Sequence, residues 1–351
     1  MGSHRGSALE FVRSGRCWPA VQSSRFGGKI VHVRAWVAVI AAVLAGVQAS
    51  ACGAAAPVTC GMNGGRPHPE IGGQILYHCA DWPQPNGGIY LLDVATGAVR
   101  ALTSDLAWNL DGSWSPDGSR IAFQSTRDGR DDIYVMDLSS GDVRRLTDGR
   151  GFNEYPDWSP DGNWILFNSS RDGSAPGTTN YYRDLYLMRP DGSGVRRLTR
   201  HAGIEADAAW NPDGERLVLM SDRSGTWDIH TMRTDGSSPE QLTHHAGYGG
   251  WAGFPRWSPE GSRIVFGSAA AEGKPYRLYG LALGDSTPHL ITPGAPGQGD
   301  VLPDWSPDGG WIVFTRIAGD TQLFAVRPDG SGLTQLTDGR GGKLLPRWRP
   351  V

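Results

Sequence analysis

The sequence predicts an all-β chain that folds as a six-bladed beta-propeller with four-stranded antiparallel blades. A Trp-Ser-Pro-Asp-Gly pentad or a close variant recurs along it, at Trp114, Trp158, Trp210, Trp257 and Trp305, with a shortened copy at Trp348. The spacings between these tryptophans are 44, 52, 47, 48 and 43 residues, a period typical of a repeated supersecondary unit. The first unit also lacks the one strand that the last unit has, so the two ends complement each other.

One unit, residues 114–147, contains the strands of a whole blade. The first strand ends at Trp114, and the Ser-Pro-Asp-Gly that follows makes a turn, because Pro fixes φ and Gly accepts a left-handed conformation. Short apolar segments predict further strands at 120–123, 133–136 and 143–147, separated by glycine-containing turns. The same order recurs at 158–199, 210–243, 257–292 and 305–337.

The two ends of the repeat array predict how the ring closes. Strands are expected around 75–77, 89–92 and 99–103, with no Trp-x-Pro strand before them, whereas nothing follows Trp348-Arg349-Pro350. The C-terminal strand should therefore join the N-terminal blade as its innermost strand, which removes the open sheet edges. An open solenoid is the alternative, but it would need polar capping repeats at both ends.

The N-terminal region predicts export. Residues 35–47 form an apolar run of thirteen residues, which suits the central region of a secretory signal peptide and is short for a membrane span. A buried core helix is the alternative. We expect a leader and signal peptide at 1–51 with a true start near Val31, a linker at 52–70 and the propeller at 71–351.

The cysteines and the residues around the cleavage site bear on anchoring. Ala49-Ser50-Ala51 followed by Cys52 resembles a bacterial lipobox, although Ala49 replaces the more usual Leu. We expect lipidation of Cys52 at the cell envelope, with ordinary cleavage and a periplasmic or secreted protein as the alternative. Cys60 and Cys79 would remain in an oxidising compartment and are candidates for a disulfide, with two unpaired thiols as the alternative.

The charge balance excludes some partners. Loss of residues 1–51 removes six Lys/Arg and one acidic residue, leaving 27 basic and 35 acidic residues and a net charge of −8. Such a surface disfavours nucleic acid and anionic membranes, so membrane contact is expected only through a lipid on Cys52. We expect a monomer.

Motifs that carry chemistry do not occur in the sequence. It has no Gly-x-Ser-x-Gly elbow, no His-Glu-x-x-His, no Cys-x-x-Cys and no phosphate-binding glycine loop. We therefore expect no catalytic residues, no cofactor and no metal.

The pentad, the Ser-x-Arg-Asp-Gly loop, the Asp-Ile-Tyr strand and the terminal Arg-Leu-Thr resemble the β-propeller repeat of TolB and its relatives over about residues 71–350. The resemblance implies the propeller fold. It leaves function open, because similar repeats build the Tol-system periplasmic protein, propeller domains of prolyl-oligopeptidase-like and tricorn-type peptidases, and several carbohydrate-acting proteins. TolB proper also has an N-terminal α/β domain, for which residues 52–70 leave no room, so the resemblance covers the propeller part only.

Most recurring residues are expected to be structural. The pentad tryptophans should pack between blades, and the pentad aspartates should form turns. The aspartates that precede third strands, Asp132, Asp184 and Asp228, should hold the arginines of the preceding loops, Arg127, Arg171 and Arg223. A ring of metal ligands is the alternative for these aspartates.

The linkers between blades differ from one repeat to the next, and they should lie at the mouth of the propeller channel. Their aromatic and carboxylate side chains suit peptide amines or sugar hydroxyls. The candidate ligand-binding residues are Asp105, Trp108, Asn153, Glu154, Tyr155, Glu205, Asp207, His245, Tyr248, Trp251 and Asp300.

The predicted function is a non-catalytic binding or scaffold module at the cell envelope, with a protein, peptide or glycan held on the channel-mouth face. The alternative is a propeller enzyme, a lyase or hydrolase acting on polysaccharide or lactone. That enzyme would need His201, Glu205, Asp207 or His245 to converge around a metal or substrate.

Overall fold

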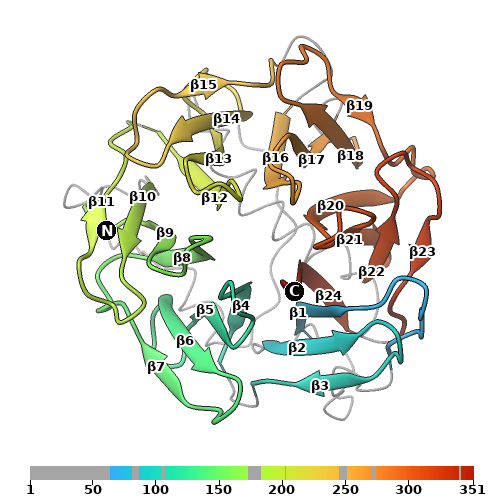
Figure 1. Ribbon diagram of the computed structural model, residues 1–351, viewed down its shortest axis with the longest axis horizontal. Coiled ribbons are helices and arrows are strands. Elements are labelled where there is room, and N and C mark those ends of the chain that lie inside the picture. The colour runs from blue at the N-terminus through green and yellow to red at the C-terminus, as the bar shows by residue number, and fades with distance from the viewer. Residues whose placement is uncertain are drawn as a thin grey trace, which may run out of the picture. The chain divides into compact units, whose positions relative to one another are not determined.

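The computed structural model describes residues 64–80, 87–103, 107–172, 183–201, 203–244, 251–269, 274–339 and 341–351. Within them, strands β1 to β24 form six four-stranded antiparallel sheets. Figure 1 shows these sheets as blades around a ring, with β4, β8, β12, β16, β20 and β24 toward the centre. The predicted all-β, six-bladed propeller is confirmed. In these residues no helix is long and apolar enough to cross a membrane.

The blades are numbered here from the N-terminus, and their strands are given from the ring centre outward. Blade 1 comprises β24 (Gly342–Trp348), β1 (Gln74–Ala80), β2 (Gly87–Asp93) and β3 (Val99–Ala101). Blade 2 comprises β4 (Asn109–Trp114), β5 (Arg120–Ser125), β6 (Asp132–Asp137) and β7 (Val143–Arg145). Blade 3 comprises β8 (Asn153–Trp158), β9 (Ile165–Ser169), β10 (Asp184–Met188) and β11 (Arg196–Arg197).

The second half of the ring repeats this order. Blade 4 comprises β12 (Glu205–Trp210), β13 (Arg216–Ser221), β14 (Asp228–Arg233) and β15 (Glu240–Gln241). Blade 5 comprises β16 (Trp251–Trp257), β17 (Arg263–Ala269), β18 (Tyr276–Ala282) and β19 (His289–Leu290). Blade 6 comprises β20 (Gly299–Trp305), β21 (Ile312–Ala318), β22 (Asp320–Val326) and β23 (Thr334–Gln335).

The ring closes in blade 1, as the sequence predicts. The C-terminal strand β24 pairs antiparallel with β1, with Ile75 opposite Trp348 and Cys79 opposite Lys343. The same strand contacts β20 and β4, the inner strands of the adjacent blades. The inner edge of each sheet therefore has a neighbour all the way round, which protects it from pairing with other chains.

A second contact reinforces this closure at the periphery. Gly65 forms an isolated bridge with Thr337, and the Arg66 amide donates to the Leu336 carbonyl at 2.8 Å. The Arg66 guanidinium also pairs with Asp338 at 2.9 Å. The segment just before β1 thus attaches to the outer side of blade 6, so both ends of the ring join.

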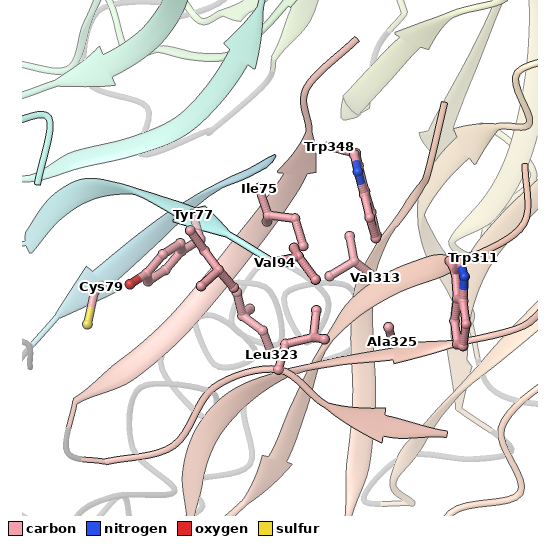
Figure 2. Packing of buried hydrophobic residues seen from close by; sticks show 11 residues of the cluster. Ile75, Tyr77, Cys79, Val94, Trp311, Val313, Leu323, Ala325 and Trp348 are labelled. Atoms are coloured by element: carbon pink, nitrogen blue, oxygen red, sulfur yellow. The ribbon is translucent and has the colours of Figure 1, made fainter. Parts of the chain in front are cut away.

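The pentad tryptophans pack where blades meet, and their predicted structural role is confirmed. Trp158 of blade 3 shares a buried cluster with Ala122 and Ile133 of blade 2. Figure 2 shows the equivalent cluster between blades 1 and 6, in which Ile75 and Trp348 meet Val313. Each interface buries a large aromatic against aliphatic side chains, which contributes about 1.5–3 kcal/mol per fully buried large side chain.

The pentad turns also form as predicted. Asp117 accepts hydrogen bonds from the Ser115 hydroxyl and from the Ser119 amide, and Gly118 has a φ of +63°. These hydrogen bonds, led by that of Ser115, lower the pKa of Asp117 to about 2. The turn thus prefers an ionised aspartate at this position.

Candidate functional site

Every inner strand carries a β-bulge three residues before its tryptophan. The ladder with the second strand shifts register there in all six blades. The bulge residues all have φ between +48° and +59° although none is glycine: Asp111, Tyr155, Asp207, Phe254, Leu302 and Leu345. Non-glycine residues held in this region cost about 1–3 kcal/mol each, so the surrounding sheet must enforce the conformation.

The bulge changes the predicted position of several candidate residues. We expected Asn153, Glu205 and Asp300 in linkers, but each lies at or next to the start of an inner strand and is fully buried. The inner strands are longer than predicted, because the bulge interrupts the alternation by which a strand is recognised in sequence. These residues therefore lie in the framework of the blades rather than on its surface.

An arginine from the second strand of the blade, or from the loop directly after it, holds each of these three side chains. Arg171 donates to Asn153 at 3.0 Å, and Arg223 pairs with Glu205. Arg316 makes a two-pronged contact with Asp300 at 2.7 and 2.9 Å.

The sequence predicted that Asp132, Asp184 and Asp228 hold the arginines of the preceding loops, and this prediction is wrong. Asp132 accepts from the Thr147 hydroxyl and pairs with Arg145, both from the outer end of its own blade. Asp184 likewise pairs with Arg197 rather than with Arg171. In blades 2 and 3 the Arg-x-Thr at the end of the unit is thus the partner of the aspartate, and in blade 4 Gln241 and Thr243 hold Asp228. The loop arginines contact the first strand instead.

Charged side chains meet at the centre of the ring. Asp207 of blade 4 pairs with Arg256 of blade 5 at 2.8 Å, and Arg347 of blade 1 approaches the same carboxylate oxygen to 3.8 Å. Blades 1 and 4 are opposite each other, so this contact crosses the centre. The second oxygen of Asp207, Oδ2, is buried without a hydrogen-bond partner among the described residues.

Two further candidate residues lie beside this centre. Glu154 pairs with Arg183 of its own blade at 2.8 Å, and burial raises the pKa of Glu154. Tyr155 is buried at the bulge, and burial together with nearby Asp111 raises the pKa of its hydroxyl well above its ordinary value. Both residues are thus part of one buried polar region rather than of an open loop.

Asp111 is a further buried carboxyl of this region. It is 6 % exposed, and its Oδ1 has no hydrogen-bond partner among the described residues. Burial, followed by the charges of Asp207 and Glu154, raises its pKa well above 3.8. An isolated buried carboxylate is costly, so a nearby cation would stabilise the ionised form of Asp111.

The position just before the tryptophan has a structural task. Asp157 accepts from the Trp210 amide at 3.1 Å, and Asp304 accepts from the Trp348 amide at 2.7 Å, each tryptophan belonging to the next blade. Burial raises the pKa of Asp157 to about 6 and that of Asp304 to about 7, and Arg256 opposes both shifts. The carboxyl groups of Asp157 and Asp304 connect neighbouring blades, and they are two further acidic groups at the centre of the ring.

We call this set the central cluster. Its members come from the inner strands and, for Arg183, from the residue just before β10: Asp111, Glu154, Asp157, Arg183, Asp207, Arg256, Asp304 and Arg347. The sequence singled out Glu154 and Asp207 and missed the others. A signal was present, since Pro156, Pro255, Pro303 and Pro346 directly follow bulge residues, and proline inside a strand marks a bulge.

Two candidate aromatic residues lie at the entry to their inner strands, on the linker face. The ring of Trp108 lies 5.9 Å from that of His78, and Trp251 packs edge-on against Tyr276 at 4.8 Å. Both tryptophans are partly exposed. They are at the rim of the central cluster rather than in it.

The remaining candidates cannot be placed. Asp105, His245 and Tyr248 lie outside the described residues, as do Cys52 and Cys60. Cys79 is disulfide-bonded, and every other cysteine of the chain lies outside the described residues. Its pairing with Cys60 therefore stays a prediction. In the described ranges, no group of three or more His, Cys, Asp and Glu side chains could hold a metal ion.

The fold and its centre define the chain as a six-bladed β-propeller with a charged, bulged inner ring. The chain belongs to the TolB beta propeller domain family, whose model matches residues 72–176 and 177–351. The crystal structure of TolB from Acinetobacter baumannii is 26 % identical with a TM-score of 0.69, covering 80 % of this chain and 67 % of that one.

Two other similarities set limits on what this membership implies. A "Protein TolB homolog" from Chlorobium luteolum is 40 % identical over 43 residues, which is 12 % of this chain and 10 % of the relative. The chain therefore matches about a tenth of that relative. An oligogalacturonate lyase in complex with manganese is 16 % identical with a TM-score of 0.53, covering 78 % of this chain and 77 % of that one. This last likeness shows the fold alone.

Proposed function

We propose that the protein is an exported, non-catalytic binding module of the cell envelope. It holds a protein or peptide segment on the linker face of the ring, where a cationic group of the ligand, an amine or a guanidinium, contacts the central cluster. Membership of the TolB beta propeller domain family supports a binding role, and the chemistry of the cluster supports the charge of the ligand.

The observation that carries the proposal is a pair of buried carboxylate oxygens, Asp111 Oδ1 and Asp207 Oδ2, neither of which has a hydrogen-bond partner in the part of the chain that the structure describes. A buried polar atom without a partner costs about 1–3 kcal/mol, and more when it is charged. The cluster has five carboxyl groups and three guanidinium groups, so it offers more acceptor oxygens than its arginines occupy. A cation bound beside Asp111 would supply the missing donor and lower the pKa that burial has raised.

The rest of the bulge ring suits the apolar part of such a ligand. Blades 5, 6 and 1 carry Phe254, Leu302 and Leu345 at the bulge, whereas blades 2 to 4 carry Asp111, Tyr155 and Asp207. The inner ring thus has a polar arc and an apolar arc. A lysine, an arginine or a free peptide N-terminus next to an apolar side chain has both parts.

The test measures binding of short lysine-containing peptides by titration calorimetry, with free and with acetylated amines. We expect the free-amine peptides to bind and the acetylated ones to bind at least about tenfold more weakly. The Asp111→Asn variant should also lose about tenfold in affinity, since asparagine tolerates the left-handed backbone but carries no charge.

A control variant separates this effect from general damage. Asp161→Asn alters a pentad aspartate on the opposite face and should leave peptide affinity unchanged. The Asp111→Asn variant should be at least as stable as the parent, because it removes a buried acid. Equal binding of free and acetylated peptides, or turnover of a polysaccharide or lactone at this cluster, would contradict the proposal.

Export and anchoring belong to the same proposal. The apolar run at 35–47 would direct secretion, and Cys52 would carry the lipid that holds the propeller at the envelope. N-terminal mass spectrometry of the native protein tests this point: a diacylated Cys52 is expected. An unmodified N-terminus at Cys52 would leave a periplasmic or secreted protein, and an intact leader would contradict export.

A further inference from the structure

On the pentad face, opposite the linkers, an arginine covers the tryptophan of the next blade at three junctions, and at two of them it comes from the same repeat position. The Arg120 guanidinium lies 4.8 Å from the ring of Trp158, and that of Arg263 lies 4.9 Å from the ring of Trp305. Both arginines stand six residues after their own pentad tryptophan. The same position in blade 3 is occupied by Trp164, so an indole replaces the guanidinium at the junction with Trp210.

This exchange leaves a pocket between blades 3 and 4. Its volume is about 480 Å³, within the range of roughly 300–1,000 Å³ that is usual for small-molecule sites. Both indoles line it, together with Leu187. The polar lining residues are Ser159, Asp161, Arg196, Asp213 and Thr234.

The indole of Trp164 is held in place. The Arg189 guanidinium lies 3.9 Å from the ring of Trp164, and that of Arg196 lies 5.2 Å from it. Arg189 also donates to the Asn163 carbonyl at 3.3 Å, which fixes the stack. The other tryptophan at this repeat position, Trp311, is 8 % exposed and is packed in the cluster between blades 6 and 1. Of the two tryptophans at this repeat position, Trp164 is therefore the partly exposed one, and it lies beside a pocket.

The polar groups around the indoles include acidic and basic side chains, and therefore both hydrogen-bond acceptors and hydrogen-bond donors. Asp161 and Asp213 offer carboxylate oxygens, and Arg196 offers guanidinium donors. The Nε1 atom of Trp210 is buried, so its indole presents carbon atoms to the pocket. A ligand for this lining needs a flat apolar face and several hydroxyls that both donate and accept, with no net charge.

We propose that this pocket binds a neutral sugar, one or two pyranose rings of a glycan. The C–H face of a pyranose ring packs on an indole, and its hydroxyls hydrogen-bond to carboxylates and guanidinium groups that are fixed in place. The pocket is on the face away from the central cluster. This site therefore does not depend on the proposed peptide-binding function.

The experiment follows tryptophan fluorescence and ligand-detected NMR of the full protein while neutral disaccharides of glucose and of N-acetylglucosamine are added. At least one disaccharide is expected to bind at millimolar concentrations or below. The Trp164→Arg variant should fold, because arginine stands at the same position in blades 2, 4 and 5. It should lose about tenfold or more in sugar affinity.

Two controls make the outcomes distinct. Arg120→Ala, at the equivalent junction of blades 2 and 3, and Asp111→Asn, at the ring centre, should both leave sugar affinity unchanged. The proposal is overturned if no disaccharide binds, or if the folded Trp164→Arg variant binds sugar as the parent does. The proposal is also overturned if a proline-rich peptide, tested as an alternative ligand, binds this pocket and the sugars do not.

Discussion

Asp304 offers a direct test of the physical account of the ring centre. Its carboxylate accepts the Trp348 amide at 2.7 Å, and burial raises its pKa from 3.8 to about 7. In the unfolded chain the same carboxyl ionises near 3.8. Between these values the folded protein keeps a proton that the unfolded protein has lost, so stability falls as the pH rises through this window.

The size of the effect follows from the two pKa values. Each pH unit between about 4 and 7 costs roughly 1.4 kcal/mol, or roughly 4 kcal/mol in total, as an upper bound. The Asp304→Asn variant has no carboxyl group that titrates in this range, and its amide oxygen can still accept the hydrogen bond from the Trp348 amide. Near pH 4 the two proteins should agree within about 1 kcal/mol. At pH 8 the variant should be more stable by roughly 3 kcal/mol.

Urea unfolding of parent and variant between pH 4 and pH 8 measures this difference. Asp117→Asn is the matched control, because hydrogen bonds lower the pKa of Asp117 to about 2. The Asp117→Asn control should be less stable than the parent by a constant amount from pH 4 to pH 8. The reason is that the ionisation of Asp117 differs between the folded and unfolded states only below about pH 4. A stability difference for Asp304→Asn that does not change with pH would refute our account of the buried carboxyl.

Two further substitutions test buried groups elsewhere. His230 is 2 % exposed, and within the described ranges neither ring nitrogen has a hydrogen-bond partner. Burial lowers the pKa of His230 to about 4, so the protein loses stability as the pH falls from 6.5. His230→Phe should add about 1–2 kcal/mol at pH 7 and more at pH 5 by thermal unfolding, whereas His78→Phe, which removes a 2.7 Å hydrogen bond to the Asn109 carbonyl, should not stabilise. Arg256→Met should lower the free energy of unfolding by about 3–5 kcal/mol, because it leaves the buried Asp207 without its cationic partner. The double variant Arg256→Met/Asp207→Asn should recover most of that stability. A double variant as unstable as Arg256→Met alone would argue against the pairing.

The fold was accessible from sequence because its determinants are local and repeated. The pentad specifies a turn through residues whose backbone preferences are strong, as the Asp117 hydrogen bonds and the positive φ of Gly118 confirm. The strand missing from the first unit and present in the last predicted the pairing of β24 with β1. Both inferences needed only the order of residues along the chain.

The site was less accessible because it depends on contacts between blades. Arg347 and Asp207 are far apart in sequence and meet only across the ring centre. Glycine is absent at the bulge, so the positive φ of Tyr155 and Leu302 is signalled only indirectly, by the proline that follows each of them. Strand alternation also fails at a bulge, which is why Glu205 and Asp300 were expected in linkers.

The repeats combine a fixed backbone with a free choice of side chain at one position. The bulge has nearly the same φ whether it carries Asp111, Tyr155 or Leu345, so the backbone there is imposed by the ring and not by the residue. The pentad has no such freedom, because its turn depends on which residues it contains. Changes at the bulge can therefore alter the charge and shape of the ring centre with little effect on the blades. This is the position at which propellers built from the same repeat are expected to differ in what they bind.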